Sequence, residues 1–130
     1  WNLRVVNTRH TVQNLGLRLE AGSPTKVFCY SGDGMFTPTA SKLYTNADLL
    51  VHEAYTSYWT LKNPRGETVT IGTKTHCSLQ QLERLDDMAR PKKMALIHLN
   101  RKLREEKKDI LKKYRQRRWI MPDAGEVIEL

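Results

Sequence analysis

The stretch at residues 48–53, Asp48-Leu49-Leu50-Val51-His52-Glu53, has the same form as the stretch at residues 93–98, Lys93-Met94-Ala95-Leu96-Ile97-His98. Each is a short, unbroken apolar run that ends in an ionisable residue. A run that is apolar on both faces is typical of a central strand that helices cover. The two stretches therefore predict the middle of an α/β sheet, with ionisable side chains where the strands end.

Weaker signals on either side of these strands predict the remaining elements. In chain order they are a β-hairpin at 15–30, a short helix or turn at 40–47, a helix at 78–89, a basic helix at 101–118 and a final strand at 126–130. The helix at 78–89 has the clearest start, because Ser78 and Gln81 form a capping-box signature. Residues 55–75 predict a long irregular or hairpin-bearing loop. This order of elements is that of an α/β domain.

The composition is that of an ordinary globular domain. The chain has 130 residues, of which 39% are hydrophobic and 28% are charged, and this balance excludes collagen-like and disordered classes. The longest apolar runs are far shorter than the roughly 20 residues that cross a bilayer, so we expect no membrane-spanning helix and no membrane partner. Trp1-Asn2-Leu3-Arg4 has no signal-peptide pattern, which indicates part of a longer chain or a processed product.

Cysteine usage and charge predict a compartment and a class of partner. Cys29 and Cys77 are too few and too far apart for a disulfide framework, which favours a reducing, cytoplasmic location. The formal net charge is +8, and residues 101–118 hold ten basic and three acidic side chains. This basic helix predicts contacts with nucleic-acid phosphates, and the alternative is an ordinary solvated face. The candidate contacts are Lys107, Lys108, Lys112, Lys113 and Arg115.

Metal-ligating side chains fall at the ends of the predicted elements. They are the four histidines of the chain and the acid of the turn 31–34: His10, His52, His76, His98 and Asp33. Imidazole and carboxylate are ligands that zinc accepts, but no pair of these residues has the short, fixed spacing of a metal motif. The residues by themselves predict a metal or acid–base site at one edge of the sheet.

Five motifs then carry a resemblance to a known family. They are Thr8-Arg9-His10 with Asn14-Leu15-Gly16, Tyr30-Ser31-Gly32-Asp33, Val51-His52-Glu53-Ala54, Thr75-His76-Cys77-Ser78 and Ala95-Leu96-Ile97-His98. In this order they resemble the C-terminal half of a metallo-β-lactamase-fold hydrolase, and most of all its ribonuclease Z branch, which includes tRNase Z and phosphodiesterase relatives. The resemblance implies that residues 1–130 form half of an αββα sandwich, a mixed sheet with helices on its outer face and the basic helix at about 100–118.

The resemblance also implies a role for each motif residue. His10 would bind one metal ion, His98 a second, and Asp33 would bridge both. His76 would protonate the leaving oxygen of a phosphodiester, and Glu53 would hold His76 in its orientation and protonation state. The implied activity is metal-dependent phosphodiester hydrolysis or RNA processing, with two Zn²⁺ ions per complete site and Mn²⁺ as an alternative.

Three departures from the family pattern open alternatives. The family's first signature, HxHxDH, is absent, so we expect a missing N-terminal half or a second chain to complete the site and cover an apolar sheet face, and the family also implies a homodimer. The segment 10–33 has room only for a hairpin where many tRNA-processing members carry an arm, so a cyclic nucleotide or another small phosphodiester is an alternative substrate. An inactive module that binds RNA or a partner through residues 101–118 is the other alternative. Cys77 stands where the family usually has serine, and we expect it to be a small buried residue.

Overall fold

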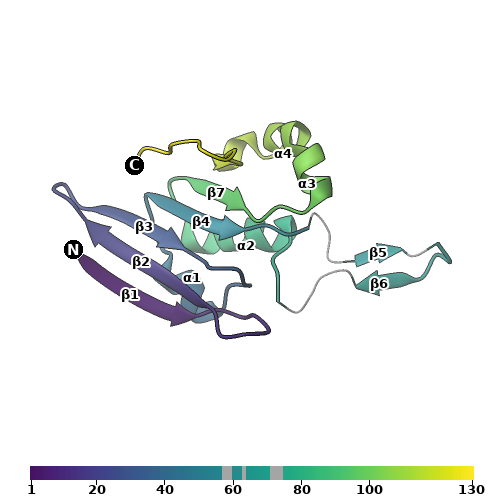
Figure 1. Ribbon diagram of the computed structural model, residues 1–130, viewed down its shortest axis with the longest axis horizontal. Coiled ribbons are helices and arrows are strands. Elements are labelled where there is room, and N and C mark those ends of the chain that lie inside the picture. The colour runs from purple at the N-terminus through teal and green to yellow at the C-terminus, as the bar shows by residue number, and fades with distance from the viewer. Residues whose placement is uncertain (57–59, 63, 71–74) are drawn as a thin grey trace.

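The computed structural model describes residues 1–56, 60–62, 64–70 and 75–130 of the chain. A six-stranded sheet has the strand order β1-β2-β3-β4-β7-β8, and β5 pairs with β6 in a separate hairpin (Figure 1). The strands are β1 (Asn2–Asn7), β2 (Leu15–Ala21), β3 (Lys26–Tyr30), β4 (Leu49–Glu53), β5 (Thr60–Lys62), β6 (Thr68–Thr70), β7 (Met94–Ile97) and β8 (Trp119–Ile120). The helices are α1 (Pro38–Leu43), α2 (Leu79–Ala89), α3 (Arg101–Glu105) and α4 (Lys107–Lys113), followed by the 3-10 turn η1 (Arg115–Arg117).

The sheet is mixed, as the sequence predicts. β1, β2 and β3 pair in antiparallel succession, whereas β3, β4, β7 and β8 are parallel. Because parallel strands point the same way, the carboxyl ends of β3, β4 and β7 lie along one edge of the sheet. That edge is where polar residues that are far apart in sequence can meet.

Helices cover one face of the sheet, which we call the closed face. The register places Cys29, Leu50 and Met94 side by side on this face, and all three are fully buried. α1 and α2 lie against it (Figure 1), and Tyr44, Leu82 and Leu85 join the same apolar core. Ser78 caps α2 with the predicted capping box, so the helix at 78–89 is confirmed.

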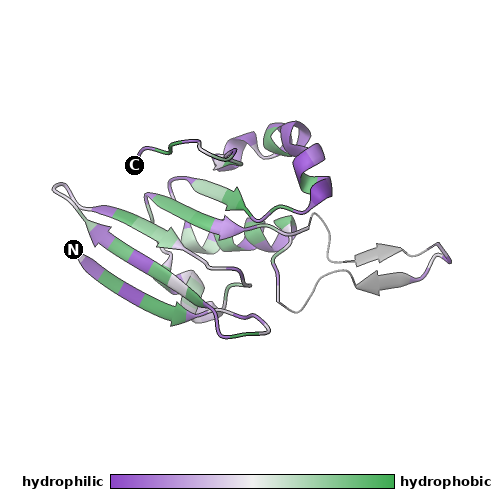
Figure 2. Ribbon diagram, in the orientation of Figure 1, coloured by the Kyte–Doolittle hydropathy of each residue, from purple (hydrophilic) through white to green (hydrophobic). Residues whose placement is uncertain are grey.

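The opposite face of the sheet has no helical cover, and we call it the open face. Apolar and hydrophilic residues alternate along β1 and β2 (Figure 2), and the register assigns the apolar set to this face. Its apolar side chains that remain exposed or half-buried are Leu3, Val5, Leu15, Leu17, Leu19, Phe28, Tyr30, Val51, Ile97 and Ile120. The half-sandwich prediction anticipates such an uncovered apolar face.

The predicted single helix at 101–118 is wrong in its continuity. α3 ends at Glu105, α4 begins at Lys107, and a 3-10 turn follows before the chain enters β8. Like charges recur three and four residues apart in this segment, which disfavours one continuous helix. Contacts with α2 also redirect the chain: Tyr114 donates a hydrogen bond to Glu83, and Arg117 pairs with Asp86 at 3.1 Å. These contacts bring Trp119 to the edge of β7.

The predicted final strand at 126–130 is also wrong. β8 at Trp119–Ile120 pairs with the edge of β7 instead, and neither β8 nor β1 is among the predicted strands. Residues 126–130 form no ladder, and Val127 is 84% exposed. Pro122, two residues after β8, lacks the N–H that would prolong the pairing with β7.

The predicted hairpins and the short helix are confirmed. β2 and β3 pair as the predicted hairpin, and α1 falls at the predicted short helix or turn. The loop at 55–75 contains the β5–β6 hairpin, which extends away from the main sheet (Figure 1). None of the described helices is long and apolar enough to cross a bilayer.

Asp48 ties three segments of the sheet together, and its removal tests that role. Its carboxylate accepts hydrogen bonds from Lys92 Nζ and from the Val27 N–H, each at 2.8 Å. We expect Asp48→Ala to lower the free energy of unfolding of the complete protein by about 1–3 kcal/mol in a denaturant titration, because the Val27 N–H loses its partner. The control is Glu129→Ala, which removes an exposed carboxylate.

The same interactions set a pH dependence. Hydrogen bonds from Lys92 and from Val27 lower the pKa of Asp48 in the folded state. The stabilisation by Asp48 is therefore full above the ordinary pKa of aspartate and is lost as the pH falls through the lowered value. Equal unfolding midpoints for Asp48→Ala and the wild type at neutral pH would contradict this role.

Candidate metal centre

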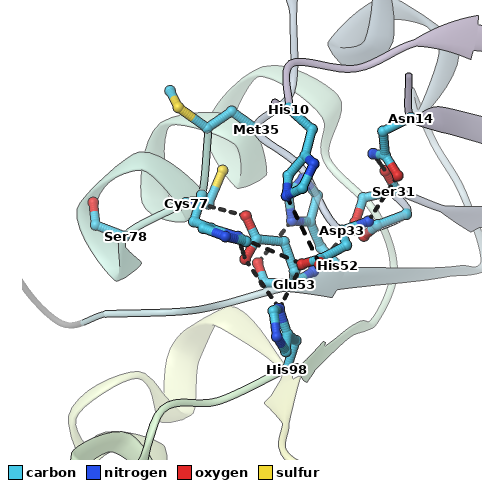
Figure 3. Close-up of polar contacts among 12 residues, drawn as sticks. His10, Asn14, Ser31, Asp33, Met35, His52, Glu53, Cys77, Ser78 and His98 are labelled. Carbon is cyan, nitrogen blue, oxygen red and sulfur yellow. Dashed lines mark hydrogen bonds and ion pairs between the residues drawn. The ribbon is translucent and has the colours of Figure 1, made fainter. Parts of the chain in front are cut away.

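The five predicted site residues come together where β3, β4 and β7 end. Asp33 lies in the turn after β3, Glu53 is the last residue of β4, and His98 follows β7. His10 lies in the segment between β1 and β2, and His76 precedes α2. Figure 3 shows the side chains of His10, Asp33, Glu53 and His98 pointing toward one another. The parallel strand order is what gathers them from five segments of the chain.

The turn at 31–34 has a backbone that positions Asp33. Gly32 has φ +67°, and a Cβ there would lie within 2.8 Å of the Asn14 amide group and the Leu15 carbonyl. Asn14 Oδ1 accepts the Asp33 N–H at 3.2 Å, and Asn14 Nδ2 donates to Thr8 Oγ1. One amide side chain therefore fixes the Asp33 turn against the segment that carries His10.

Asp33 occupies the middle of the cluster. Its Oδ1 lies 2.5 Å from His98 Nδ1 and 3.4 Å from His76 Nδ1, and its Oδ2 lies 3.9 Å from His10 Nε2. Potential ligand atoms of Asp33, Glu53, His76 and His98 all lie within 4.8 Å of one another. Because its two oxygens face different imidazoles, the Asp33 carboxylate has the placement that a bridging ligand needs.

Glu53 is fully buried beneath this cluster. Its Oε1 accepts the Cys77 N–H at 2.5 Å, and its Oε2 lies 3.2 Å from His76 Nδ1. Burial raises the pKa of Glu53 to about 8, and burial lowers the pKa of His76. Both shifts favour the neutral form of the pair, because desolvation penalises charge.

Two further features shape the surroundings of the cluster. His98 has φ +52°, a left-handed backbone that residues with a side chain seldom adopt and that is often found at functional sites. The Tyr55 ring stacks on His76 with 4.8 Å between the ring centroids. Together they form one wall of the centre.

His52 and Cys77 do not point into the centre. His52 is buried on the closed face, where its Nδ1 lies 2.8 Å from the Glu53 carbonyl oxygen and its ring packs edge-on against Phe36 and Tyr44. Burial lowers the pKa of His52 to about 4, so the ring is neutral at neutral pH. His52 therefore belongs to the packing of the closed face and not to the centre. Cys77 is fully buried, as expected of a small core residue.

The five predicted nucleic-acid contacts have different surroundings, and their role stays a prediction. Lys107 lines a cavity beside His98, and its Nζ pairs with Asp123 at 2.9 Å. Lys113 lines a different cavity, against α2, and lies 4.9 Å from the centroid of the Tyr114 ring. The other three residues, Lys108, Lys112 and Arg115, are exposed and line neither cavity.

Three residues of the centre were not identified as site residues by the sequence argument. Asn14 holds the Asp33 turn, Ser31 Oγ accepts the Glu53 N–H at 3.2 Å, and Tyr55 stacks on His76. Asn14 and Ser31 do fall inside the motifs, and each lies within two residues of a glycine. A polar residue close to a glycine is the only local signal, and it does not say which group the side chain will bind.

The donor set fits a divalent ion of the zinc or manganese type. Imidazole nitrogens and carboxylate oxygens are ligands that both metals accept. Half of the Asp33 side chain and 46% of the His98 side chain are exposed, so an ion can reach both from solvent. Glu53 is less suited to bind an ion directly, because it is fully buried and accepts a hydrogen bond from the Cys77 N–H.

Similarity to known proteins is seen in three dimensions only. No protein-family model matches the chain, and no curated protein matches its sequence. The short form of human tRNase Z aligns with 78% of this chain at 20% identity and a TM-score of 0.57, over 38% of its own length. The metallo-β-lactamase fold protein YhfI from Bacillus subtilis aligns with 83% of this chain at 19% identity and a TM-score of 0.58, over 42% of its own length.

A long form RNase Z from yeast gives a third match of the same kind. It aligns with 76% of this chain at 20% identity and a TM-score of 0.56, over 13% of its own length. The chain thus spans less than half the length of each of these three proteins. It is a mixed α/β sheet with the metallo-β-lactamase fold in part, and the fold predicted from the sequence is confirmed.

Proposed function

We propose that the chain is part of a metal-dependent phosphodiesterase or RNA-processing hydrolase of the ribonuclease Z type. The observation that carries the proposal is the convergence of Asp33, Glu53, His76 and His98, whose ligand atoms lie within 4.8 Å of one another. Carboxylates and imidazoles gathered at the carboxyl ends of parallel strands are a common basis for hydrolytic metal sites. The similarity of fold to two tRNase Z and RNase Z structures supports the choice of reaction class.

In this proposal, Asp33, His98 and His10 hold the metal ions. Asp33 stands between the other two, with one oxygen toward His98 and one toward His10. A bound divalent ion would act as a Lewis acid on a phosphoryl oxygen and lower the pKa of water. Asn14 positions Asp33 for this role through the backbone of the 31–34 turn.

His76 and Glu53 handle the proton. His76 Nδ1 lies 3.2 Å from Glu53 Oε2, so the buried carboxyl fixes the orientation of the ring. When Nε2 gives its proton to a leaving oxygen, Nδ1 would take the proton of the neutral Glu53 carboxyl, so that the ring stays neutral and the carboxyl becomes a carboxylate. The Cys77 N–H holds the second carboxyl oxygen of Glu53, so that the carboxyl group cannot rotate away. A general acid of this kind typically contributes 10²–10⁴-fold to the rate.

The remaining part of the site would come from a segment that covers the open face. That face carries ten apolar side chains that are exposed or half-buried, and the chain spans less than half the length of each of the three matched proteins. We propose that a second sheet, the N-terminal half of the same fold, packs there. A second chain with the same half would be equivalent, and the homodimer implied by the resemblance stays a prediction.

Two valines test this cover. Val5 lies on the open face and is 59% exposed, and Val127 lies outside the sheet and is 84% exposed. In the complete protein we expect Val5→Glu to lower the free energy of unfolding by about 2 kcal/mol or more, because a carboxylate would be buried without a partner. Val127→Glu should change it by less than about 0.5 kcal/mol. Equal effects of the two substitutions in a denaturant titration would contradict a covered open face.

A pair of substitutions separates metal binding from proton transfer. We expect Asp33→Ala to abolish both bound metal, measured by elemental analysis, and hydrolysis of bis(p-nitrophenyl) phosphate. We expect His76→Ala to keep at least half of the metal and to lose 10²–10⁴-fold in kcat, because it removes only the general acid. Asp109→Ala, which removes an exposed acid of α4, is the control.

Two results would contradict this assignment of roles. Loss of metal from His76→Ala equal to that from Asp33→Ala would make His76 a ligand. If the complete protein binds metal but hydrolyses no phosphodiester, the proposed activity is wrong. The alternative, an inactive module that binds RNA or a partner, would then remain.

A small phosphodiester is the second candidate substrate. The observation that favours it is the short connection between β2 and β3, which leaves no room for a projecting arm between His10 and Asp33. A cyclic nucleotide needs no such arm.

A further inference from the structure

We infer that the cavity beside His98 binds the nucleotide next to the scissile phosphodiester, so that the substrate is a single-stranded oligonucleotide and not a cyclic mononucleotide. The inference rests on the proposed function. It adds a binding subsite and a substrate class to it, and both follow from the cavity and the charges that line it.

The cavity has the size of a ligand pocket and adjoins the candidate centre. Its volume is about 690 Å³, within the range of small-molecule sites. It lies between the end of β7, the start of α3 and the segment 121–124. Leu96, Leu99 and Met121 supply apolar lining that suits the face of a base.

Three basic residues line the same cavity: Arg101, Arg104 and Lys107. They are spaced three residues apart, which brings them to neighbouring positions across α3 and the start of α4. Arg101 pairs with Glu105 at 2.7 Å, and Lys107 pairs with Asp123 at 2.9 Å. Within the described ranges, Arg104 has no acidic partner, so its guanidinium is available for two parallel hydrogen bonds to a phosphate.

The cavity is continuous with the candidate centre through two residues. His98 lines it and also lies 2.5 Å from Asp33, and Tyr55 lines it and also stacks on His76. A phosphodiester held at Asp33 and His98 would therefore have its neighbouring nucleotide in the cavity. That nucleotide brings a second phosphate, which Arg104 can bind.

The number of phosphates distinguishes the two substrates. A cyclic mononucleotide has one phosphate, and the centre would occupy it, so Arg104 would have no phosphate to contact. An oligonucleotide has a phosphate at every step and can occupy the centre and the cavity together. The more distant basic residues, such as Lys112 and Arg115, do not line this cavity and are not needed for the contact.

The test compares two exposed arginines. Arg104 and Arg84 are both exposed helical arginines without an acidic partner in the part of the chain that the structure describes, but Arg84 lies on α2 and away from the cavity. The complete protein and its Arg104→Gln and Arg84→Gln variants are titrated into fluorescein-labelled hexauridylate. Anisotropy is read in EDTA at several salt concentrations, so that binding is measured without hydrolysis.

We expect Arg104→Gln to weaken hexauridylate binding at least tenfold and to reduce the salt dependence by about one phosphate contact. Arg84→Gln should stay within about twofold of the wild type. Equal affinity of Arg104→Gln and the wild type, or equal losses in both variants, would overturn the inference. A tenfold loss of cyclic AMP competition in Arg104→Gln would also overturn it, because the cavity would then serve a mononucleotide.

Hydrolysis is scored separately with metal present. A wild type that cleaves bis(p-nitrophenyl) phosphate, with Arg104→Gln binding hexauridylate as tightly as the wild type, would reject the subsite alone. A wild type that binds hexauridylate in an Arg104-dependent way but cleaves no phosphodiester would reject the proposed activity alone. With both present, we expect Arg104→Gln to lower kcat/KM for the oligonucleotide at least tenfold more than for bis(p-nitrophenyl) phosphate.

Discussion

The buried carboxyl group of Glu53 is the constraint on which the rest of the centre depends. A carboxyl group without solvent is costly unless every oxygen has a partner, and here the Cys77 N–H and His76 supply both partners. Those contacts fix the start of α2 against the end of β4, and the Glu53 N–H fixes Ser31 beside the Asp33 turn. The arrangement of three separate segments around the centre therefore follows from satisfying one buried acid.

The two faces of the sheet divide stability from function. The closed face carries the apolar core with α1 and α2, and even its histidine, His52, is kept neutral by burial. The titratable side chains lie at the carboxyl ends of β3, β4 and β7, because the turns that follow parallel strands are free to vary. None of the described helices covers the open face, so the chain has the architecture of one half of a sandwich, a sheet with helices on a single face.

Much of the fold and centre could be predicted from local sequence. The apolar runs at 48–53 and 93–98 are central strands, and the Ser78 capping box starts a helix, because burial on both faces and capping leave local signatures. The breaks in the 101–118 helix, the place of β8 and the absence of a strand at 126–130 were not predictable, since each depends on which edge or helix face the chain meets. Asn14 was missed for the same reason: its partners, Ser31 and Asp33, are distant in sequence.

The wide sequence spacing of the centre has a consequence for how the protein acquires it. His10 and His98 lie far apart in the sequence, and the pairing of β4 with β7, which aligns Glu53 with Ile97, closes a long crossover connection. Pairings of high sequence separation form late, because the entropy of loop closure opposes them until the core is in place. The candidate metal ligands can therefore face one another only when the sheet is nearly native. An ion that recognises this set would bind the folded state alone, and its affinity would add directly to the stability of that state.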